Sequence, residues 1–313
     1  MSSFKKPLIV GSKEFLFSGL SDSDLYFRDL ESSSEGGFAE LCGNILTKDS
    51  VVLDVGANIG ITTAILSTFV PNGKVISIEP DPAVFDLLNL NIEQNHIENI
   101  RTFQLALSER EGMVSFAPNS AFGHLVISEN QDLGSISVRS TTVDLLVKSL
   151  NLDRVDFIKI DVEGFEPNVL SGAKETISKF RPVIYCELNS WCLLDHGDHN
   201  PLDFVENLFD SFEHVYMVNR NFKSNLFVLP KVAGSSSRSK ARQIVHENIV
   251  RNNSWDDLIF FNEPSRFKSP LNQAPPTSIP GDNLLMHTQV AVDSSMKSWL
   301  RILRKFPRKY FKT

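Results

Sequence analysis

The chain has 313 residues, of which 42% are hydrophobic and 22% charged, a composition typical of a globular protein. The net charge is −7, yet residues 296–313 carry seven basic residues and no acid, so removing that +7 leaves −14 on residues 1–295. Such an acidic body argues against duplex nucleic acid as a partner, and no apolar run reaches the roughly 20 residues of a membrane-spanning helix.

The start of the chain, MSSFKKPLIVGS, has no long apolar segment and no clear cleavage site, so we expect a mature, cytoplasmic protein. The three cysteines, Cys42, Cys186 and Cys192, have no metal-like spacing, which favours reduced thiols. Residues 1–46 mix short apolar segments with polar turns. This pattern predicts a short β-containing lead-in that ends in a helix near residues 37–46.

From Val51 onward, apolar strand patterns alternate with helical patterns. We predict residues 47–263 to be one α/β domain with a mostly parallel seven-stranded sheet covered by helices on both faces. Residues 108–140 are predicted to be irregular or β-rich, and residues 233–240 to be a mobile loop. Strands are predicted at residues 50–55, 74–79, 101–107, 155–161, 181–188, 214–219 and 256–261, and helices at 59–69, 82–95, 141–150, 167–180 and 201–212.

A glycine-rich motif, LDVGANIG, lies at the first predicted strand-to-helix turn of this domain. Gly56 and Gly60 permit a tight turn, and the next helix offers free N–H groups. A dinucleotide fingerprint reads G-x-G-x-x-G and needs its second glycine next to the pyrophosphate, but Asn58 stands at that place. The turn, with Asp54 before it, therefore favours a ligand without a pyrophosphate, and S-adenosylmethionine fits.

Glu79 ends the second strand of the domain, 25 positions after Asp54. An acid there can accept hydrogen bonds from both ribose hydroxyls of a nucleoside cofactor. This role suits a nicotinamide cofactor equally, so a nicotinamide-dependent oxidoreductase is an alternative, as is a non-catalytic binding module that keeps the fold. After the third strand, Ala106 is expected near the adenine.

Several motifs in succession resemble those of the FkbM-type methyltransferases, from about Val51 to Phe212. The resemblance rests on LDVGANIG, SIEPDP, QLALSE, TTVDLL, DFIKIDVEGFEPNVLSGA and RPVIYCEL. It implies a Rossmann-like methyltransferase fold, S-adenosylmethionine as the donor, and transfer to an oxygen, typically a hydroxyl of a sugar or a polyketide.

Acids gather where the fourth and fifth strands of the predicted domain end. Asp161 is expected at a strand tip, where it can take the acceptor's proton, bind a metal or hold the methionine amine. Glu163 points to the same side if the chain stays extended, and Glu187 ends the neighbouring strand. These three carboxylates are candidate ligands for Mg²⁺. Glu166 is interpreted as a helix-start carboxylate.

Other side chains near the predicted site have a functional and a structural interpretation. His124 follows the third strand and is a candidate general base. His196 and His199 have metal-like composition but fit a solvated loop better. Trp191 and Phe122 can stack on a sugar ring or simply pack.

The C-terminal part is predicted to lie outside this domain. Residues 264–295 are rich in proline and polar residues, which predicts a linker. Residues 296–313 place apolar and aromatic side chains on one arc of a helical wheel and basic ones on the other, although Pro307 would interrupt the helix. Such a helix is typical of peripheral membrane contact, and docking on the acidic body is the alternative.

Overall fold

The computed structural model divides the chain into two units, Met1–Asn272 and Gln273–Thr313. All of the second unit lies outside the described residues, and so do most of the predicted linker and the whole predicted helix 296–313. No helix within the described residues is long and apolar enough to cross a bilayer. The structure describes residues 4–10, 13–21, 27, 36–119, 122–126, 134–218, 227–228 and 236–266.

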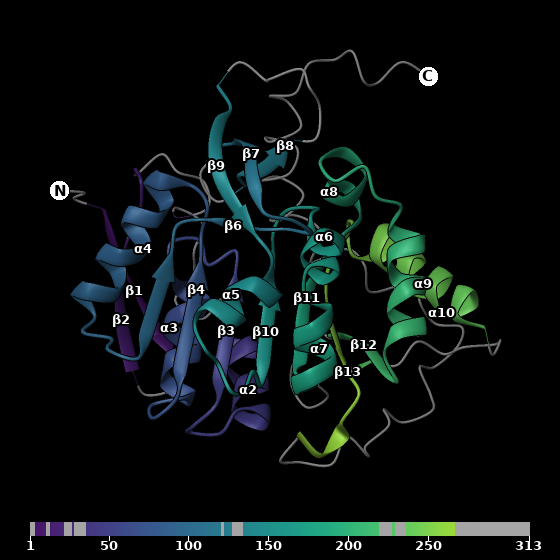
Figure 1. Cartoon of the computed structure of the whole chain (residues 1–313), viewed down its shortest axis with the longest axis horizontal. Helices are drawn as coiled ribbons and strands as arrows, with labels where there is room; N and C mark the ends of the chain where they lie inside the picture. The colour runs from purple at the N-terminus through teal and green to yellow at the C-terminus, as the bar shows by residue number, and fades with distance from the viewer. Residues whose placement is uncertain are drawn as a thin grey trace, which may run out of the picture. The chain divides into compact units, whose positions relative to one another are not determined.

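A large, mostly parallel sheet forms the centre of the first unit (Figure 1). The strand β14 pairs antiparallel with both of its neighbours, β11 and β12. The sequence predicted seven strands, and the described sheet has an eighth, the two-residue β13. In spatial order the strands are β13 (Phe227–Val228), β12 (His214–Val218), β14 (Trp255–Phe261), β11 (Val183–Asn189), β10 (Phe157–Ile160), β3 (Val51–Val55), β4 (Lys74–Ile78) and β5 (Ile100–Phe103).

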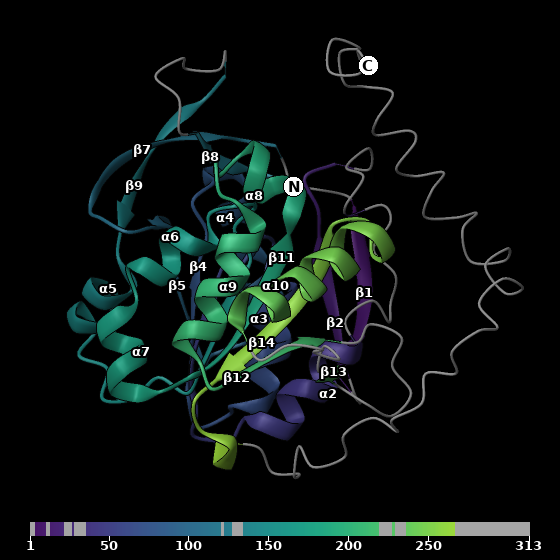
Figure 2. The same ribbon diagram turned by 90° about the vertical axis from the view of Figure 1, so that its right-hand side faces the viewer.

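The central strands are buried on both faces, because helices cover both sides of the sheet (Figure 2). Val52 and Phe157 face one apolar core, and their chain neighbours Leu53 and Ile158 face the other. The first core is shared with α2 (Gly36–Ile45), α3 (Ile61–Phe69) and α4 (Pro82–Gln94). The second is shared with α5 (Val143–Ser149), α6 (Glu166–Ser171), α7 (Lys174–Phe180), α9 (Pro201–Ser211) and α10 (Ser237–His246).

Two predictions of local structure, one of a helix and one of a loop, were wrong in detail. The helix predicted at residues 167–180 is split into α6 and α7 at Gly172, where a Cβ atom would lie 2.1 Å from the carbonyl oxygen of Ser108. The segment predicted as a mobile loop contains the start of α10, which continues into a π-helix (Glu247–Arg251). This polar sequence is helical here because Ala241 and Ile244 are buried in the second apolar core. Arg238 of α10 adds ion pairs with Asp203 and Glu206 of α9.

A second sheet of four strands stands beyond the carboxyl ends of the main strands (Figure 1). The strand predicted at residues 101–107 is divided between the two sheets, because β5 ends at Phe103 and β6 (Ala106–Leu107) pairs with β9 (Ile136–Thr141). The β-rich prediction for residues 108–140 is confirmed by β7 (Gly112–Ala117), β8 (His124–Val126) and β9.

The N-terminal lead-in is a hairpin of β1 (Lys5–Val10) and β2 (Lys13–Ser18). Asn91 of α4 joins it to the body, since its side chain accepts from Ser18 N and donates to Ser18 O. Leu8, Phe15 and Phe17 are buried in the same core as α3 and α4. The remaining described helices are α8 (Ser190–Asp195) and a 3-10 turn (Pro264–Arg266).

Candidate functional site

The glycine-rich turn joins β3 to α3 and packs tightly against the end of β10. Gly56 has φ +76°, and a Cβ atom there would lie 1.8 Å from the carbonyl oxygen of Asp161. Gly60 also has a positive φ, +96°, and precedes α3 as an N-cap without a side-chain hydrogen bond to the helix. Gly60 therefore does not cap the first N–H groups of α3 with a side chain. A helix start that binds an anion needs such N–H groups to be available to the ligand.

Asp54 lies beneath this turn with no exposed surface. Its carboxylate accepts hydrogen bonds from Thr63 Oγ1 at 2.6 Å and from Thr62 Oγ1 at 3.0 Å. Lys159 Nζ lies 3.7 Å away. Burial raises the pKa of Asp54, and Lys159 and the threonines oppose that shift. The cofactor role predicted for Asp54 stays a prediction, and its placement means that it supports the turn from below.

Glu79 follows β4 and is hydrogen-bonded to the glycine-rich turn. Its two carboxylate oxygens accept from Asn58 N and Asp81 N, each at 2.9 Å. Burial raises the pKa of Glu79 to about 7. Each oxygen keeps a second acceptor position, so two ribose hydroxyls can still be accommodated. Asn58, at φ +52°, lies directly beside this carboxylate.

Lys159 connects the turn to the end of β10. Its side chain is almost fully buried, and its Nζ donates to Gly56 O at 2.9 Å and lies 3.1 Å from Asp161 Oδ2. This lysine is not among the site residues predicted from the sequence. A lysine inside a strand predicted to be buried was the available signal, because a buried ammonium group needs partners.

Asp161, Glu163 and Glu187 come together as the sequence predicted. One oxygen of each carboxylate lies within 4.8 Å of those of the other two. The register explains this: Ile160 pairs with Cys186, so Asp161 and Glu187 follow side by side on β10 and β11. The Asp161 side chain is 40% exposed, whereas Glu187 is buried.

The route by which Glu163 reaches the cluster differs from the prediction. The chain does not stay extended, because Glu163 has φ +53° in the left-handed region. The next residue, Gly164, is pressed against α8, where a Cβ atom would lie 2.3 Å from Cys192 O. Cys192 Sγ donates to Glu163 Oε2 at 3.1 Å, a contact that sequence reasoning missed.

Burial dominates the electrostatics of these acids. It raises the pKa of Glu163 to about 8, with Asp161 as the next cause. Burial and then Asp161 raise the pKa of Glu187 well above its ordinary value. The negative charges are therefore costly here unless a proton or a cation offsets them.

Glu166 begins α6, as predicted, and is completely buried. Its Oε1 accepts from Val162 N at 3.0 Å and Gly164 N at 3.2 Å, so it holds the turn that carries Glu163. Burial raises the pKa of Glu166 to about 7.

Aromatic rings from two distant segments meet beside the acids. The His124 and His196 rings are stacked, with centroids 3.6 Å apart and planes at 2°. Trp191 of α8 meets His196 edge-on at 5.0 Å. His196 also donates from Nδ1 to Glu163 O at 3.0 Å, since the carbonyl oxygen can only accept. Through these contacts, His196 joins the small sheet, α8 and the turn that carries Glu163.

The remaining predicted residues have ordinary packing roles or are exposed. Ala106 is buried in β6, and its predicted contact with adenine is untested. His199 Nε2 bonds to Asn168 Oδ1 at 2.6 Å, outside the acid cluster. Phe122 and Trp191 are 44% and 46% exposed.

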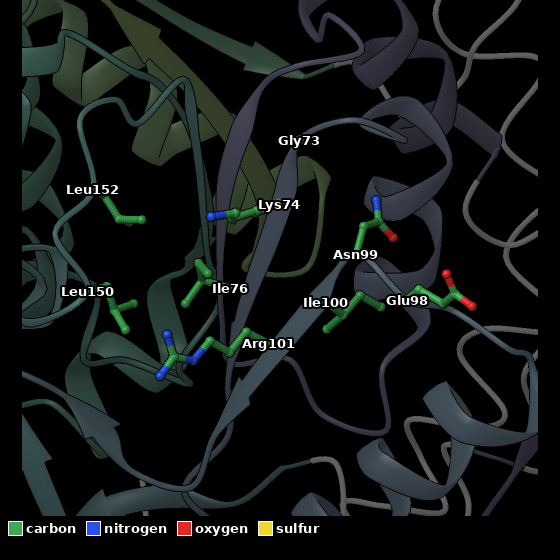
Figure 3. A pocket seen from close by; sticks show the side chains of 9 residues that line it. All are labelled: Gly73, Lys74, Ile76, Glu98, Asn99, Ile100, Arg101, Leu150 and Leu152. Atoms are coloured by element: carbon green, nitrogen blue, oxygen red, sulfur yellow. The ribbon is translucent and has the colours of Figure 1, made fainter.

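A hollow of about 330 Å³ lies elsewhere, beside the first residues of β4 and β5 (Figure 3). It is lined by Lys74, Glu98, Arg101 and neighbouring residues, and includes no predicted site residue. Ligands of parallel α/β sheets bind at the carboxyl ends of the strands, whereas this hollow is at the amino ends.

Comparisons with known proteins identify the same family as the sequence motifs did. The family model of the methyltransferase FkbM domain matches residues 54–222. The 2-O-methyltransferase NoeI of Sinorhizobium fredii is 28% identical over 197 residues, which cover 58% of this chain and 79% of that protein. The hexuronic acid methyltransferase AglP of Haloferax volcanii is 34% identical over 140 residues, which cover 44% of this chain and 55% of that protein.

Among solved structures, the precorrin-6y C5,15-methyltransferase of Geobacter metallireducens overlaps 75% of this chain and 92% of its own. The TM-score is 0.41 and the identity 15%, an overlap too weak to bear on the site or its chemistry.

Proposed function

This chain belongs to the FkbM methyltransferase family, and we propose that the atom it methylates is a hydroxyl oxygen of a sugar unit. The family makes it an S-adenosylmethionine-dependent methyltransferase and decides against the nicotinamide and non-catalytic alternatives. The names of NoeI and AglP, a 2-O-methyltransferase and a hexuronic acid methyltransferase, support an oxygen acceptor on a sugar.

The residues at the carboxyl ends of β3 and β4 fit the cofactor. The α3 start, with Gly60 as its N-cap, suits the methionine carboxylate, and Glu79 suits the ribose hydroxyls. Gly56 brings the turn so close to β10 that any side chain would clash with it. When bound, S-adenosylmethionine supplies an activated methyl group on a sulfonium centre.

The observation that carries the proposal is the Asp161 carboxylate, which is 40% exposed and lies in one cluster with Glu163 and the buried Glu187. A hydroxyl is a weak nucleophile near neutral pH, and a nearby base helps by taking its proton. The Asp161 side chain is accessible to an acceptor, and Lys159 Nζ lies 3.1 Å from its carboxylate. A carboxylate acceptor would need no base, so a base at this position favours a hydroxyl.

The other predicted catalytic residues have supporting roles in this proposal. Glu163 and Glu187 border Asp161, and a Mg²⁺ ion held by the three carboxylates is the second way to lower the pKa of the acceptor hydroxyl. The stacked His124 and His196, with the partly exposed Trp191, offer flat rings for a sugar face. His124 lies against His196 and is less well placed to act as the base.

A transfer assay with deuterated S-adenosylmethionine and a panel of pyranosides, uronic acids and simple alcohols tests the proposal. Mass spectrometry should find the label as a base-stable methyl ether on a pyranoside. Label recovered as a base-labile methyl ester would instead assign a carboxylate acceptor and contradict the proposed hydroxyl chemistry.

A further inference from the structure

The three carboxylates near the ends of β10 and β11 carry more negative charge than their surroundings offset. The oxygens of Asp161, Glu163 and Glu187 lie within 4.8 Å of one another. The nearest described cation is Lys159, whose Nζ lies 3.1 Å from Asp161 but also 3.7 Å from buried Asp54. One lysine therefore serves two acids, and Glu163 and Glu187 add to the excess.

Glu187 supplies an independent sign of a missing ligand. Its side chain is only 6% exposed, and its Oε2 has no hydrogen-bond partner among the described residues. A buried polar atom without a partner is rare in native proteins and costs stability, so such an atom calls for an explanation. Glu187 belongs to the three-carboxylate cluster, where a cation would satisfy it.

The backbone of Glu163 is held in place from outside the cluster. A left-handed conformation is unusual for glutamate, and it is fixed by the His196 contact to Glu163 O and by the close packing of Gly164 on Cys192. Glu166 binds the N–H groups on both sides of Glu163. The carboxylate is thus positioned before any ligand arrives.

We propose that Asp161, Glu163 and Glu187 bind one hard divalent cation of the Mg²⁺ class. Carboxylate oxygens are the ligands that such ions prefer, and a charge of +2 would offset the excess at the cluster. The binding site stands on this geometry alone, and its role in activating the acceptor hydroxyl rests on the proposed function.

A softer metal at an overlapping set of groups, Glu163, Cys192 and His196, is the competing assignment. One contact disfavours it. Cys192 Sγ is buried and lies 3.1 Å from Glu163 Oε2, and a thiolate this close to a carboxylate would add a further negative charge to the cluster. The hydrogen bond from His196 Nδ1 to Glu163 O leaves Nε2 as a ligand atom, so only the Cys192→Ser and His196→Ala variants separate the two assignments at this residue.

Metal binding is measured on the metal-free full chain, by Mn²⁺ electron paramagnetic resonance and by Mg²⁺ calorimetry without cofactor or acceptor. We expect one ion per chain, and at least tenfold weaker binding in Glu187→Gln and Asp161→Asn. Glu175→Gln is the control: it removes an exposed acid of α7 outside the proposed ligand set and the turn that carries Glu163, and its affinity should stay within about threefold of wild type. Thermal melts confirm that each variant is folded.

Absence of Mn²⁺ and Mg²⁺ binding to the folded wild type would overturn the proposal. So would a site that prefers Zn²⁺ and is lost in Cys192→Ser or His196→Ala but kept in Glu187→Gln. If the wild type binds Mn²⁺ but methyl transfer persists after a chelator has removed the metal, the cation site stands and its catalytic role is refuted. Binding without any transfer to pyranosides would instead count against the proposed function.

Discussion

Gly56 and Asp161 are in contact across the ends of two neighbouring strands: a Cβ atom on Gly56 would lie 1.8 Å from Asp161 O. The turn expected to meet the cofactor and the strand end expected to meet the acceptor therefore form one unit. Lys159 reinforces it, because its Nζ donates to Gly56 O and lies beside the Asp161 carboxylate.

Gly56→Ala should destabilise the protein by at least about 2 kcal/mol and abolish S-adenosylmethionine binding, because the methyl group has no space at a positive φ. Urea unfolding and calorimetry measure the two effects. Gly134→Ala is the control: Gly134 also has a positive φ, +117°, but nothing lies within 4 Å of its added Cβ. Equal losses in both variants would show that strain alone, without close approach, explains Gly56.

Asp161→Asn should lower the rate of transfer by about 10²–10⁴-fold, the usual contribution of a general base. Cofactor affinity should change less than about threefold if the carboxylate serves the acceptor. Single-turnover kinetics and calorimetry separate the two quantities, with the exposed Asp195→Asn as a charge-matched control. A large loss of cofactor affinity would instead place Asp161 on the methionine amine.

Glu79 should make stability depend on pH. Its pKa in the folded state is raised to about 7, so between about pH 4.5 and 7 the folded state binds more protons than the unfolded state. Its contribution to the free energy of unfolding is therefore present at low pH and lost as the pH rises through this window. In Glu79→Gln the decline between pH 5 and pH 8, measured by urea unfolding, should be smaller; an unchanged decline would refute the assignment.

Glu166 should matter for stability more than for chemistry. Glu166→Ala removes the acceptor of two backbone N–H groups in a buried turn and should cost about 2–4 kcal/mol. Glu166→Gln keeps one oxygen for those groups and should retain most of the stability. Unfolding curves and the transfer rate per folded molecule test this, and a glutamine variant that is stable but inactive would move Glu166 into the catalytic group.

The basic segment 296–313 is predicted from sequence to bind anionic membrane surfaces. The full chain should float with vesicles that contain phosphatidylserine, whereas a chain ending at Asn283 should not. Neutral vesicles are the control, because attraction to the basic residues requires anionic lipid. Equal flotation of both proteins would reject membrane contact through this segment.

The acid cluster was predictable only in part. Asp161 and Glu187 end consecutive parallel strands, and the alternation of strands and helices was enough to expect them side by side. The left-handed Glu163 could not be read from its sequence, because glutamate rarely adopts that conformation and tertiary packing on Cys192 imposes it.

Contacts between segments that are distant in the sequence could not be predicted either. The His124–His196 stack joins residues 72 positions apart, and hydrophobic periodicity does not indicate which loops meet. The split of the third predicted strand into β5 and β6 has the same cause, because residues 106–107 pair with β9 instead of the main sheet. Likewise, α10 packs Ala241 and Ile244 into the apolar core, a tertiary contact that no local pattern shows.

The most direct test of the central claim is a single-turnover reaction of wild type and Asp161→Asn, each saturated with deuterated S-adenosylmethionine and given the same pyranoside acceptor. We expect a base-stable, deuterated methyl ether from the wild type and at least a hundredfold slower formation by the variant, with the cofactor bound to both. Equal rates of ether formation would contradict the assignment of Asp161, and a cofactor-loaded wild type that forms only methyl esters would contradict hydroxyl transfer itself.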